Sequence, residues 1–197
     1  MSNFVICLRH GEKPVNAEDK NKDLPLDAEG PGLDANGDVN RESLTARGWR
    51  RAQMLAESQL CGQLSRPEAV RRVKFLVPKY VDKKRRDETS EHRPYQTVLA
   101  VSRRAGTVPT AVCERDEADT ILCEYVAKLE GTAVVCWQHA ALVEFANCLA
   151  SDTAPTDWPQ DRFDILWIFH RDAPDHPYSF ERVDQDVVAD ANADDCA

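Results

Sequence analysis

Short apolar runs that alternate with helix-length segments constrain the fold of this 197-residue chain more than any other sequence feature. Five mainly apolar runs are predicted strands, the first of them continuously apolar as in a buried strand, and a sixth is predicted at an edge. They are Phe4–Leu8, Val73–Val77, Val108–Val112, Ala133–Trp137 and Ile165–Phe169, with Ser179–Val183 at the edge. Helices are predicted between them, over Pro94–Arg104, Asp116–Glu130, Ala140–Ala150 and a segment capped by Thr45 that continues through Leu60.

Strands that alternate with helices form βαβ units. We therefore predict an α/β fold: a three-layer sandwich with a mostly parallel central sheet and helices on both faces. The length fits one domain, expected over 1–183. Residues 184–197 contain five Asp and no Lys or Arg, and we expect an acidic, disordered tail there. Residues 13–43 are rich in Asp, Asn, Gly and Pro, which predicts a long surface excursion, and loops of this length often cover a site.

The net charge of −9 argues against nucleic acid or an anionic membrane as the partner. No apolar run approaches the ~20 residues of a membrane span, and no signal peptide is recognisable. The seven cysteines are widely spaced and form no Cys-x-x-Cys pair, which argues against a disulfide framework or a structural zinc site. Cys7, Cys136 and Cys148 are predicted to be small buried hydrophobes, and the expected compartment is the cytoplasm.

Charged and imidazole side chains follow two of the predicted strands at their carboxyl ends, where ligands bind in such sheets. The first strand leads into Arg9-His10-Gly11-Glu12, and the fourth into Gln138-His139. Arg93 lies just before a predicted helix start, and helix N-termini favour anions. Guanidinium groups clamp phosphate oxygens, and a neutral imidazole can attack phosphorus. The pattern predicts a phosphate site.

The same residues carry a family resemblance. Arg9-His10-Gly11-Glu12 resembles the signature of the histidine phosphatase superfamily, in the branch related to cofactor-dependent phosphoglycerate mutase. Three further segments agree with the family in order and spacing: 43–52, which opens the first long helix, 90–97, which resembles Ser-x-x-Arg-x-x-Gln-Thr, and His139 as the second histidine. The resemblance extends from about Phe4 to Phe169 and implies a phosphoglycerate mutase-like sheet.

The resemblance implies a role for each residue. His10 would carry a transient phosphohistidine, while Arg9, Arg93 and His139 would hold the phosphoryl oxygens. Gly11, Glu12, Ser90 and Gln138 are expected to contact the substrate beside them. The scheme requires no metal and no organic cofactor. The partners it implies are a small phosphorylated substrate and inorganic phosphate.

The chain departs from the family pattern at the proton donor. The family places an acidic residue after the strand that follows the Arg93 helix, and here Glu114, Asp116 and Glu117 all lie in that turn. We prefer Glu114, which is closest to the strand end. Ala140 stands where the acid phosphatases and phytases have Asp, and the Asn of the mutases is missing after Glu12, so the pattern favours a phosphatase.

Alternative interpretations remain at this stage. One is a module on the same fold that binds phosphate or a phosphorylated ligand without turnover. Asp34–Asn40 resembles the start of a calcium loop but lacks its closing carboxylate, so we interpret it as solvated surface. No role is predicted for His92, His170 or His176.

Overall fold

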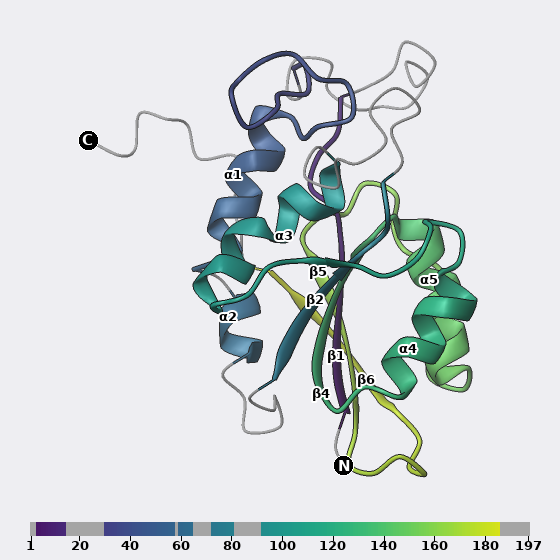
Figure 1. Cartoon of the computed structure of the whole chain (residues 1–197). Coiled ribbons are helices and arrows are strands. Elements are labelled where there is room, and N and C mark those ends of the chain that lie inside the picture. The colour runs from purple at the N-terminus through teal and green to yellow at the C-terminus, as the bar shows by residue number, and fades with distance from the viewer. Residues whose placement is uncertain (1–2, 15–29, 58, 65–71, 81–91, 186–197) are drawn as a thin grey trace.

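The computed structural model describes residues 3–14, 30–57, 59–64, 72–80 and 92–185. Its centre is a six-stranded sheet in the order β3-β2-β4-β1-β5-β6 (Figure 1). The strands are β1 (Asn3–Arg9), β2 (Val73–Val77), β3 (Thr110–Ala111), β4 (Gly131–Trp137), β5 (Ile165–Arg171) and β6 (Ser179–Asp184). All six predicted strands are therefore present, and the sixth lies at an edge as predicted.

The first four strands in chain order are mutually parallel, whereas β5 runs antiparallel to β1 and β6 antiparallel to β5. The reversal follows from the path of the chain after α5 (His139–Ala150), a helix that begins where β4 ends. The segment 151–164 returns to the carboxyl edge of the parallel strands without forming another helix, and β5 starts from that edge. The predicted α/β class with a mostly parallel sheet is confirmed.

Helices cover both faces of the sheet, because side chains alternate in direction along each buried strand. In β1, Phe4, Ile6 and Leu8 pack into one apolar cluster, while Val5 and Cys7 pack into the other. The first cluster is covered by α1 (Ala46–Met54), α2 (Gln59–Leu64) and α3 (Arg93–Arg104), and the second by the π-helix η3 (Ala118–Leu122), α4 (Cys123–Ala127) and α5. The predicted three layers are confirmed.

Two predicted helices differ from those observed. Thr45 caps α1 as predicted, accepting a hydrogen bond from the Gly48 amide, but α1 stops at Met54 and a turn separates it from α2. The helix predicted over Asp116–Glu130 is shorter and starts with the π-helical turn η3. At the carboxyl end, β6 includes Asp184 and Gln185 is buried, so the fold continues two residues into the predicted tail; 186–197 lie outside the described residues.

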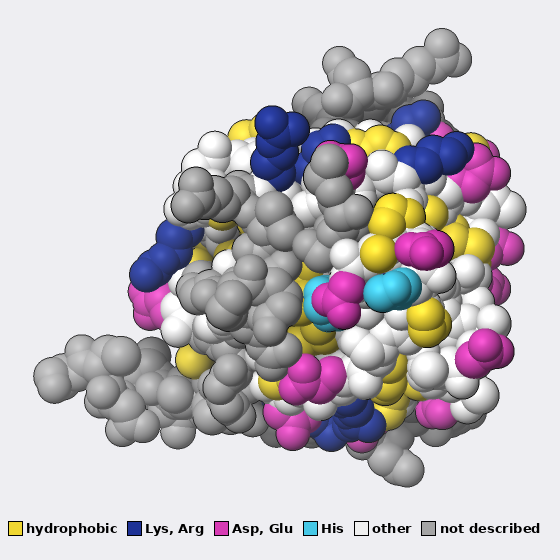
Figure 2. Space-filling view, turned by 90° about the horizontal axis from the view of Figure 1, so that it is seen from below, with side chains coloured by type: hydrophobic (Ala, Val, Ile, Leu, Met, Phe, Trp, Pro, Cys, Tyr) yellow, Lys and Arg dark blue, Asp and Glu magenta, His cyan; other side chains and the backbone are white. Residues whose placement is uncertain are grey.

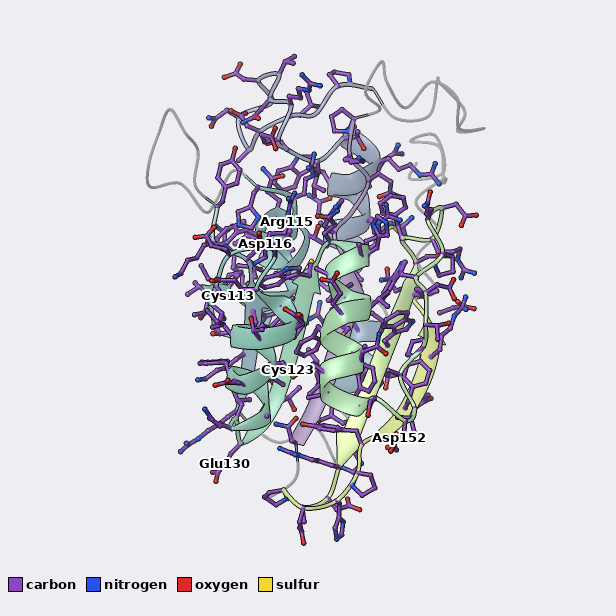
Figure 3. All side chains as sticks on the ribbon, turned by 90° about the vertical axis from the view of Figure 1, so that its right-hand side faces the viewer. Cys113, Arg115, Asp116, Cys123, Glu130 and Asp152 are labelled. Atoms are coloured by element: carbon purple, nitrogen blue, oxygen red, sulfur yellow. A yellow bond between two sulfur atoms is a disulfide. The ribbon has the colours of Figure 1, made fainter. Side chains whose placement is uncertain are left out.

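The prediction for Cys148 was wrong. It is exposed on α5 and forms a disulfide with Cys123 of α4, whose place in the chain Figure 3 marks. The two helices pack side by side on one face of the sheet, and tertiary packing brings together two cysteines that lie 25 residues apart. Cys7 and Cys136 are fully buried free thiols, as predicted.

None of the helices in the described ranges is long and apolar enough to span a membrane.

Gly48 tests how tightly α1 packs on the segment that follows β1. A Cβ at Gly48 would come within 2.6 Å of the Glu12 carbonyl oxygen. We expect Gly48→Ala to lower the free energy of unfolding by about 1–3 kcal/mol, because the backbone on both sides must move. Chemical denaturation measures the change.

The same substitution at Gly62, which is exposed in α2, is the control. There the higher helix propensity of alanine should raise stability by up to about 1 kcal/mol. Equal effects of the two substitutions would contradict the packing argument.

Candidate active site

The carboxyl ends of β1 and β4 lie side by side. Arg9 pairs with Trp137 at the end of the parallel register, and the His10 amide donates to the Trp137 carbonyl over 3.1 Å. Gln138 and His139 follow β4 and start α5, so they lie beside the segment that follows β1. The parallel register thus brings together both sequence-predicted strand-end motifs.

A pocket of about 250 Å³ opens at this edge. It lies near the lower limit of ~300–1,000 Å³ that is usual for ligand pockets, so it suits a small ligand. Its lining includes five Lys or Arg side chains and, among the described residues, one carboxylate. They are Arg9, Lys13, Lys79, Arg93 and Arg115, with Glu42. The remaining lining residues are His10, Pro78, Tyr80, His92, Pro94, Gln138 and His139.

His10 is buried and held in one tautomer. Its Nδ1 lies 2.8 Å from the Gly11 carbonyl oxygen, which can only accept, so Nδ1 carries the proton and donates. Burial, the positive charge of Arg93 and that of Arg9 lower the pKa of His10 to about 3, against the raising effect of the Gly11 hydrogen bond. The imidazole is therefore neutral near pH 7, with the lone pair on Nε2.

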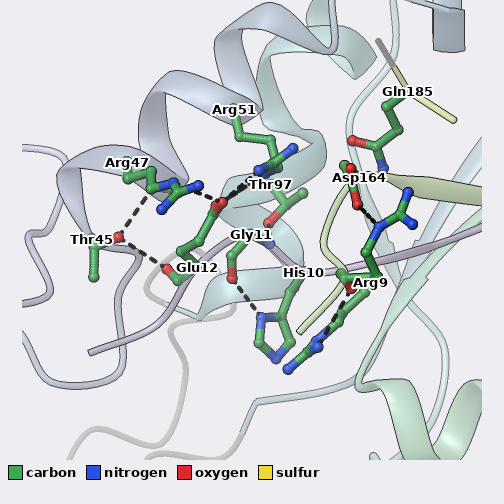
Figure 4. Close-up of polar contacts among 12 residues, drawn as sticks. Arg9, His10, Gly11, Glu12, Thr45, Arg47, Arg51, Thr97, Asp164 and Gln185 are labelled. Atoms are coloured by element: carbon green, nitrogen blue, oxygen red, sulfur yellow. Dashed lines mark hydrogen bonds and ion pairs between the residues drawn. The ribbon is translucent and has the colours of Figure 1, made fainter. Parts of the chain in front are cut away.

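Arg9 is positioned by the segment that precedes β5. Its Nη1 donates to the carbonyl oxygens of Gln160 and Arg162, and its guanidinium carbon lies 3.8 Å from the centre of the Phe163 ring. Phe163 also contacts the His10 ring, with centroids 6.4 Å apart. The guanidinium group and the imidazole consequently lie next to one another at the pocket (Figure 4).

Arg93 enters the pocket from the first turn of α3. Burial is the largest influence on the pKa of Arg93 and lowers it, while the charge of Glu42 acts in the opposite direction. The Glu42 carboxylate lies 4.0 Å from the guanidinium group, with about half of its own side chain exposed. The first turns of α3 and α5 both meet the pocket, and neither has a side-chain cap on its amide groups. Their orientation favours an anion.

Glu12 does not line the pocket, contrary to its predicted contact with substrate. Its carboxylate is buried and turned toward α1, where Arg51 Nε and Nη2 donate to it and Arg47 lies 3.5 Å away (Figure 4). The backbone is fixed at the same place, because the Thr45 amide donates to the Glu12 carbonyl oxygen. Glu12 therefore ties the segment that carries His10 to the start of α1.

Gly11 also has a role in the backbone. Its amide donates to Thr97 Oγ1 over 2.8 Å, and its carbonyl oxygen accepts the hydrogen bond from His10 Nδ1. Gln96, next to Thr97, accepts from the Leu44 amide and donates to Ser43 Oγ. These hydrogen bonds connect the segment after β1 and the segment before α1 with the start of α3.

The turn after β3 places an arginine, and not the preferred acid, in the pocket. Arg115 is among the lining residues, whereas Glu114, Asp116 and Glu117 are not. The Glu117 carboxylate accepts from the Glu114 amide and so stabilises the turn itself. Figure 3 shows Arg115 and Asp116 at the same end of this layer, above Cys123. Ser90 lies outside the described residues.

Sequence reasoning missed six of the lining residues that carry polar groups: Lys13, Glu42, Lys79, Tyr80, His92 and Arg115. Lys79 and Arg115 lie in the segments that follow β2 and β3, so the strand-end rule already used for His10 and His139 also applies to them. His92 was expected to have no role, yet it is the N-cap residue of α3 and stacks on Tyr80 with ring centroids 5.5 Å apart. No sequence signal distinguishes Glu42 from the other acidic residues of 13–43.

The opposite end of the molecule has a different surface. Figure 2 views the end at which β1 begins, where acidic side chains are spread among hydrophobic and basic ones. The described part of the chain also contains no group of three or more His, Cys, Asp or Glu arranged to hold a metal ion.

Comparisons by structure identify the fold. The protein histidine phosphatase SixA, in complex with tungstate, superposes with a TM-score of 0.54 over 92% of this chain and 96% of that chain, at 14% identity. A mycobacterial glucosyl-3-phosphoglycerate phosphatase in complex with VO3 gives 0.49 at 12% identity, over 94% and 100% of the two chains. Phosphoglycerate mutase from Bacillus anthracis gives 0.46 at 10% identity, over 92% of each chain.

Only the first of these three exceeds a TM-score of 0.5, and the fold assignment rests on it. No family model and no curated protein matches the sequence. The chain therefore has the fold of a histidine phosphatase over most of its length.

The low pKa values of two pocket histidines predict acid sensitivity. His10 has a pKa of about 3 and His92 of about 4, both below the usual 6.5. Between pH 6.5 and about 4 the unfolded chain binds protons that the native chain excludes, so stability falls as the pH is lowered through this window. For each histidine, the free energy of unfolding should fall by up to about 2 kcal/mol between pH ~7.5 and ~5, as urea unfolding can measure.

The double variant His10→Gln/His92→Gln removes both groups and should lose less stability over the same pH range. An unchanged pH dependence in this variant would contradict the assignment of these protons.

Glu12→Gln should destabilise the protein by about 3 kcal/mol, because it leaves the buried Arg51 guanidinium without its carboxylate. Thermal and urea unfolding measure the loss. The matched control is Glu124→Gln, which breaks an exposed pair with Lys128 and should cost less than about 0.5 kcal/mol. Similar losses in the two variants would show that the Glu12 pair is not a buried anchor.

Proposed function

We propose that the protein is a phosphatase that hydrolyses a phosphate monoester through a phosphohistidine on His10. The observation that carries the proposal is the state of that side chain. Its Nδ1 proton is bound to the Gly11 carbonyl oxygen, its pKa of about 3 keeps the ring neutral, and it lines a cationic pocket. A neutral imidazole with a free Nε2 lone pair is a nucleophile for phosphorus.

In the first step, His10 Nε2 attacks phosphorus and the bond to the leaving oxygen breaks. Arg9, Arg93 and His139 hold the three remaining oxygens, where the transition-state charge is spread. The first turn of α5 adds amide groups, and Gln138 lines the pocket beside them. In the second step, a water oxygen attacks phosphorus, its proton passes to the carboxylate that protonated the leaving oxygen, the P–N bond breaks and inorganic phosphate leaves. No metal or organic cofactor enters this scheme.

The leaving oxygen needs a proton, and two carboxylates compete for this role. Glu114 is the residue that the family resemblance favours, and it is exposed in the turn whose Arg115 lines the pocket. Glu42 is the carboxylate among the described lining residues. It also lies 4.0 Å from Arg93, which is proposed to hold a phosphoryl oxygen. We keep Glu114, which the family resemblance favours, as the preferred donor.

His10→Ala should reduce hydrolysis of an aryl phosphate by at least about 1,000-fold, since it removes the nucleophile. Labelled substrate should leave an acid-labile, base-stable phosphoryl group on the wild type and none on the variant. His176→Ala, an exposed histidine far along the chain, is the control and should keep both properties. Full activity of His10→Ala would refute the mechanism.

The proton donor is identified by aryl phosphates with leaving groups of different acidity. Loss of the donor should slow poor leaving groups by about 100-fold or more and good ones much less. We expect this pattern for Glu114→Gln and not for Glu42→Gln. The reverse pattern would assign the role to Glu42, and no dependence in either variant would remove both.

The second candidate is a module that binds phosphate without turnover, on the same fold. The observation that favours it is the exposed, off-pocket position of Glu114. Phosphate binding by calorimetry with no turnover of any phosphate ester would support it.

We also propose a cytoplasmic location. Disulfides such as Cys123–Cys148 are more common in oxidising compartments. Counting the free thiols of the protein isolated from its own cells shows whether this disulfide forms there, and so tests the proposed location.

A further inference from the structure

The pocket contains more positive charge than one phosphoryl group requires. Arg9 and Arg93 are the guanidinium groups that act on His10, and Lys13 adds a third charge near it. Lys79 and Arg115 line the same pocket from the segments that follow β2 and β3, and neither is among the charges that act on His10. No ion pair joins either of these two side chains to a carboxylate of the described residues, although both are exposed.

The backbone on both sides of this second part is anchored. The Lys79 amide donates to the Cys113 carbonyl oxygen over 2.7 Å, which ties the end of β2 to the end of β3. The Arg115 carbonyl oxygen accepts from Trp137 Nε1, also over 2.7 Å, and Trp137 ends β4. Two cationic side chains therefore extend from fixed points on neighbouring strand ends.

Electrostatic repulsion within the pocket points to an anion at this place. The charge of Arg115 lowers the pKa of Arg93, which means that the two guanidinium groups repel each other. The phosphoryl group neutralises Arg93 but lies at His10. A second negative group between Lys79 and Arg115 would relieve the remaining repulsion, because charge-assisted hydrogen bonds to both are available there.

A neighbouring hollow is the weaker candidate for a second anion. It has a volume of about 190 Å³ and is lined by Lys13, Pro14, Arg41, Glu42 and Arg93. Glu42 already supplies a negative charge there, 4.0 Å from Arg93. A second anion in this hollow would meet the Glu42 carboxylate that pairs with Arg93, whereas Lys79 and Arg115 are not paired with a carboxylate of the described residues.

We propose that the substrate carries a second anionic group, a carboxylate or another phosphoryl group, on its leaving group, and that Lys79 and Arg115 bind it. The proposal rests on the function proposed above, because it takes the phosphoryl group to bind at His10. Tyr80, stacked on His92, lines the pocket next to Lys79 and offers an aromatic wall for the carbon atoms between the two anions. A small, doubly anionic phosphate ester is thus the expected substrate class.

The test is calorimetry with non-hydrolysable ligands: inorganic phosphate, methylphosphonate, and two series with carbon chains of increasing length, phosphonocarboxylates and bisphosphonates. The best member of one series should bind the wild type at least about tenfold more tightly than methylphosphonate, as two charge-assisted contacts allow. In Lys79→Met/Arg115→Met that advantage should disappear, so that this ligand and methylphosphonate bind with affinities within about twofold of each other.

The control variant is Arg103→Met/Arg104→Met, which removes two exposed cations from the last turn of α3 and should keep the full advantage. If methylphosphonate binds but no phosphonocarboxylate or bisphosphonate binds more tightly, the second site is refuted while the phosphate site stands. If the advantage survives in Lys79→Met/Arg115→Met, these residues are not the site. If neither inorganic phosphate nor methylphosphonate binds, the proposed function fails, and this inference with it.

Discussion

The parallel pairing of β1 with β4 is the constraint on which the site depends. Both strands are buried along their whole length, and they stay in register to their last residues, Arg9 and Trp137. Two segments more than a hundred residues apart in sequence therefore leave the sheet at the same point. Burial of the apolar strand surface stabilises this pairing, and the pairing positions His10 and His139 at the shared end.

Around this point, polar side chains hold the loops that carry the site. The buried Glu12–Arg51 pair, the Gln96 amide and the Thr97 hydroxyl connect the segment after β1 with the starts of α1 and α3. Each such group is costly to bury alone, so the set is stable only when all partners are in place. This arrangement gives the four motif segments two tasks: some of their residues face the pocket, and the others bind one another and hold the pocket in shape.

Electrostatics separates the pocket from the rest of the molecule. A chain of net charge −9 gathers five cationic side chains around one small pocket. Burial keeps His10 neutral, and these neighbours add to the effect, since positive charges disfavour protonation of an imidazole. The same positive charges favour an anion in the pocket and disfavour a proton on His10.

The sequence by itself determined the α/β class, the position of every strand, the Thr45 cap and the residues at the ends of β1 and β4, because these follow from local periodicity and from which edge a parallel strand presents. The antiparallel direction of β5, the break between α1 and α2 and the Cys123–Cys148 disulfide were decided by tertiary packing, which local patterns do not encode. The same holds for the direction of side chains in a turn. Glu12 and Glu114 follow strands as His10 does, yet one turns to a buried arginine and the other to solvent, while Arg115 takes the place at the pocket. Which neighbour of a strand end faces the ligand depends on partners that are distant in sequence, and only the folded chain brings those partners into contact.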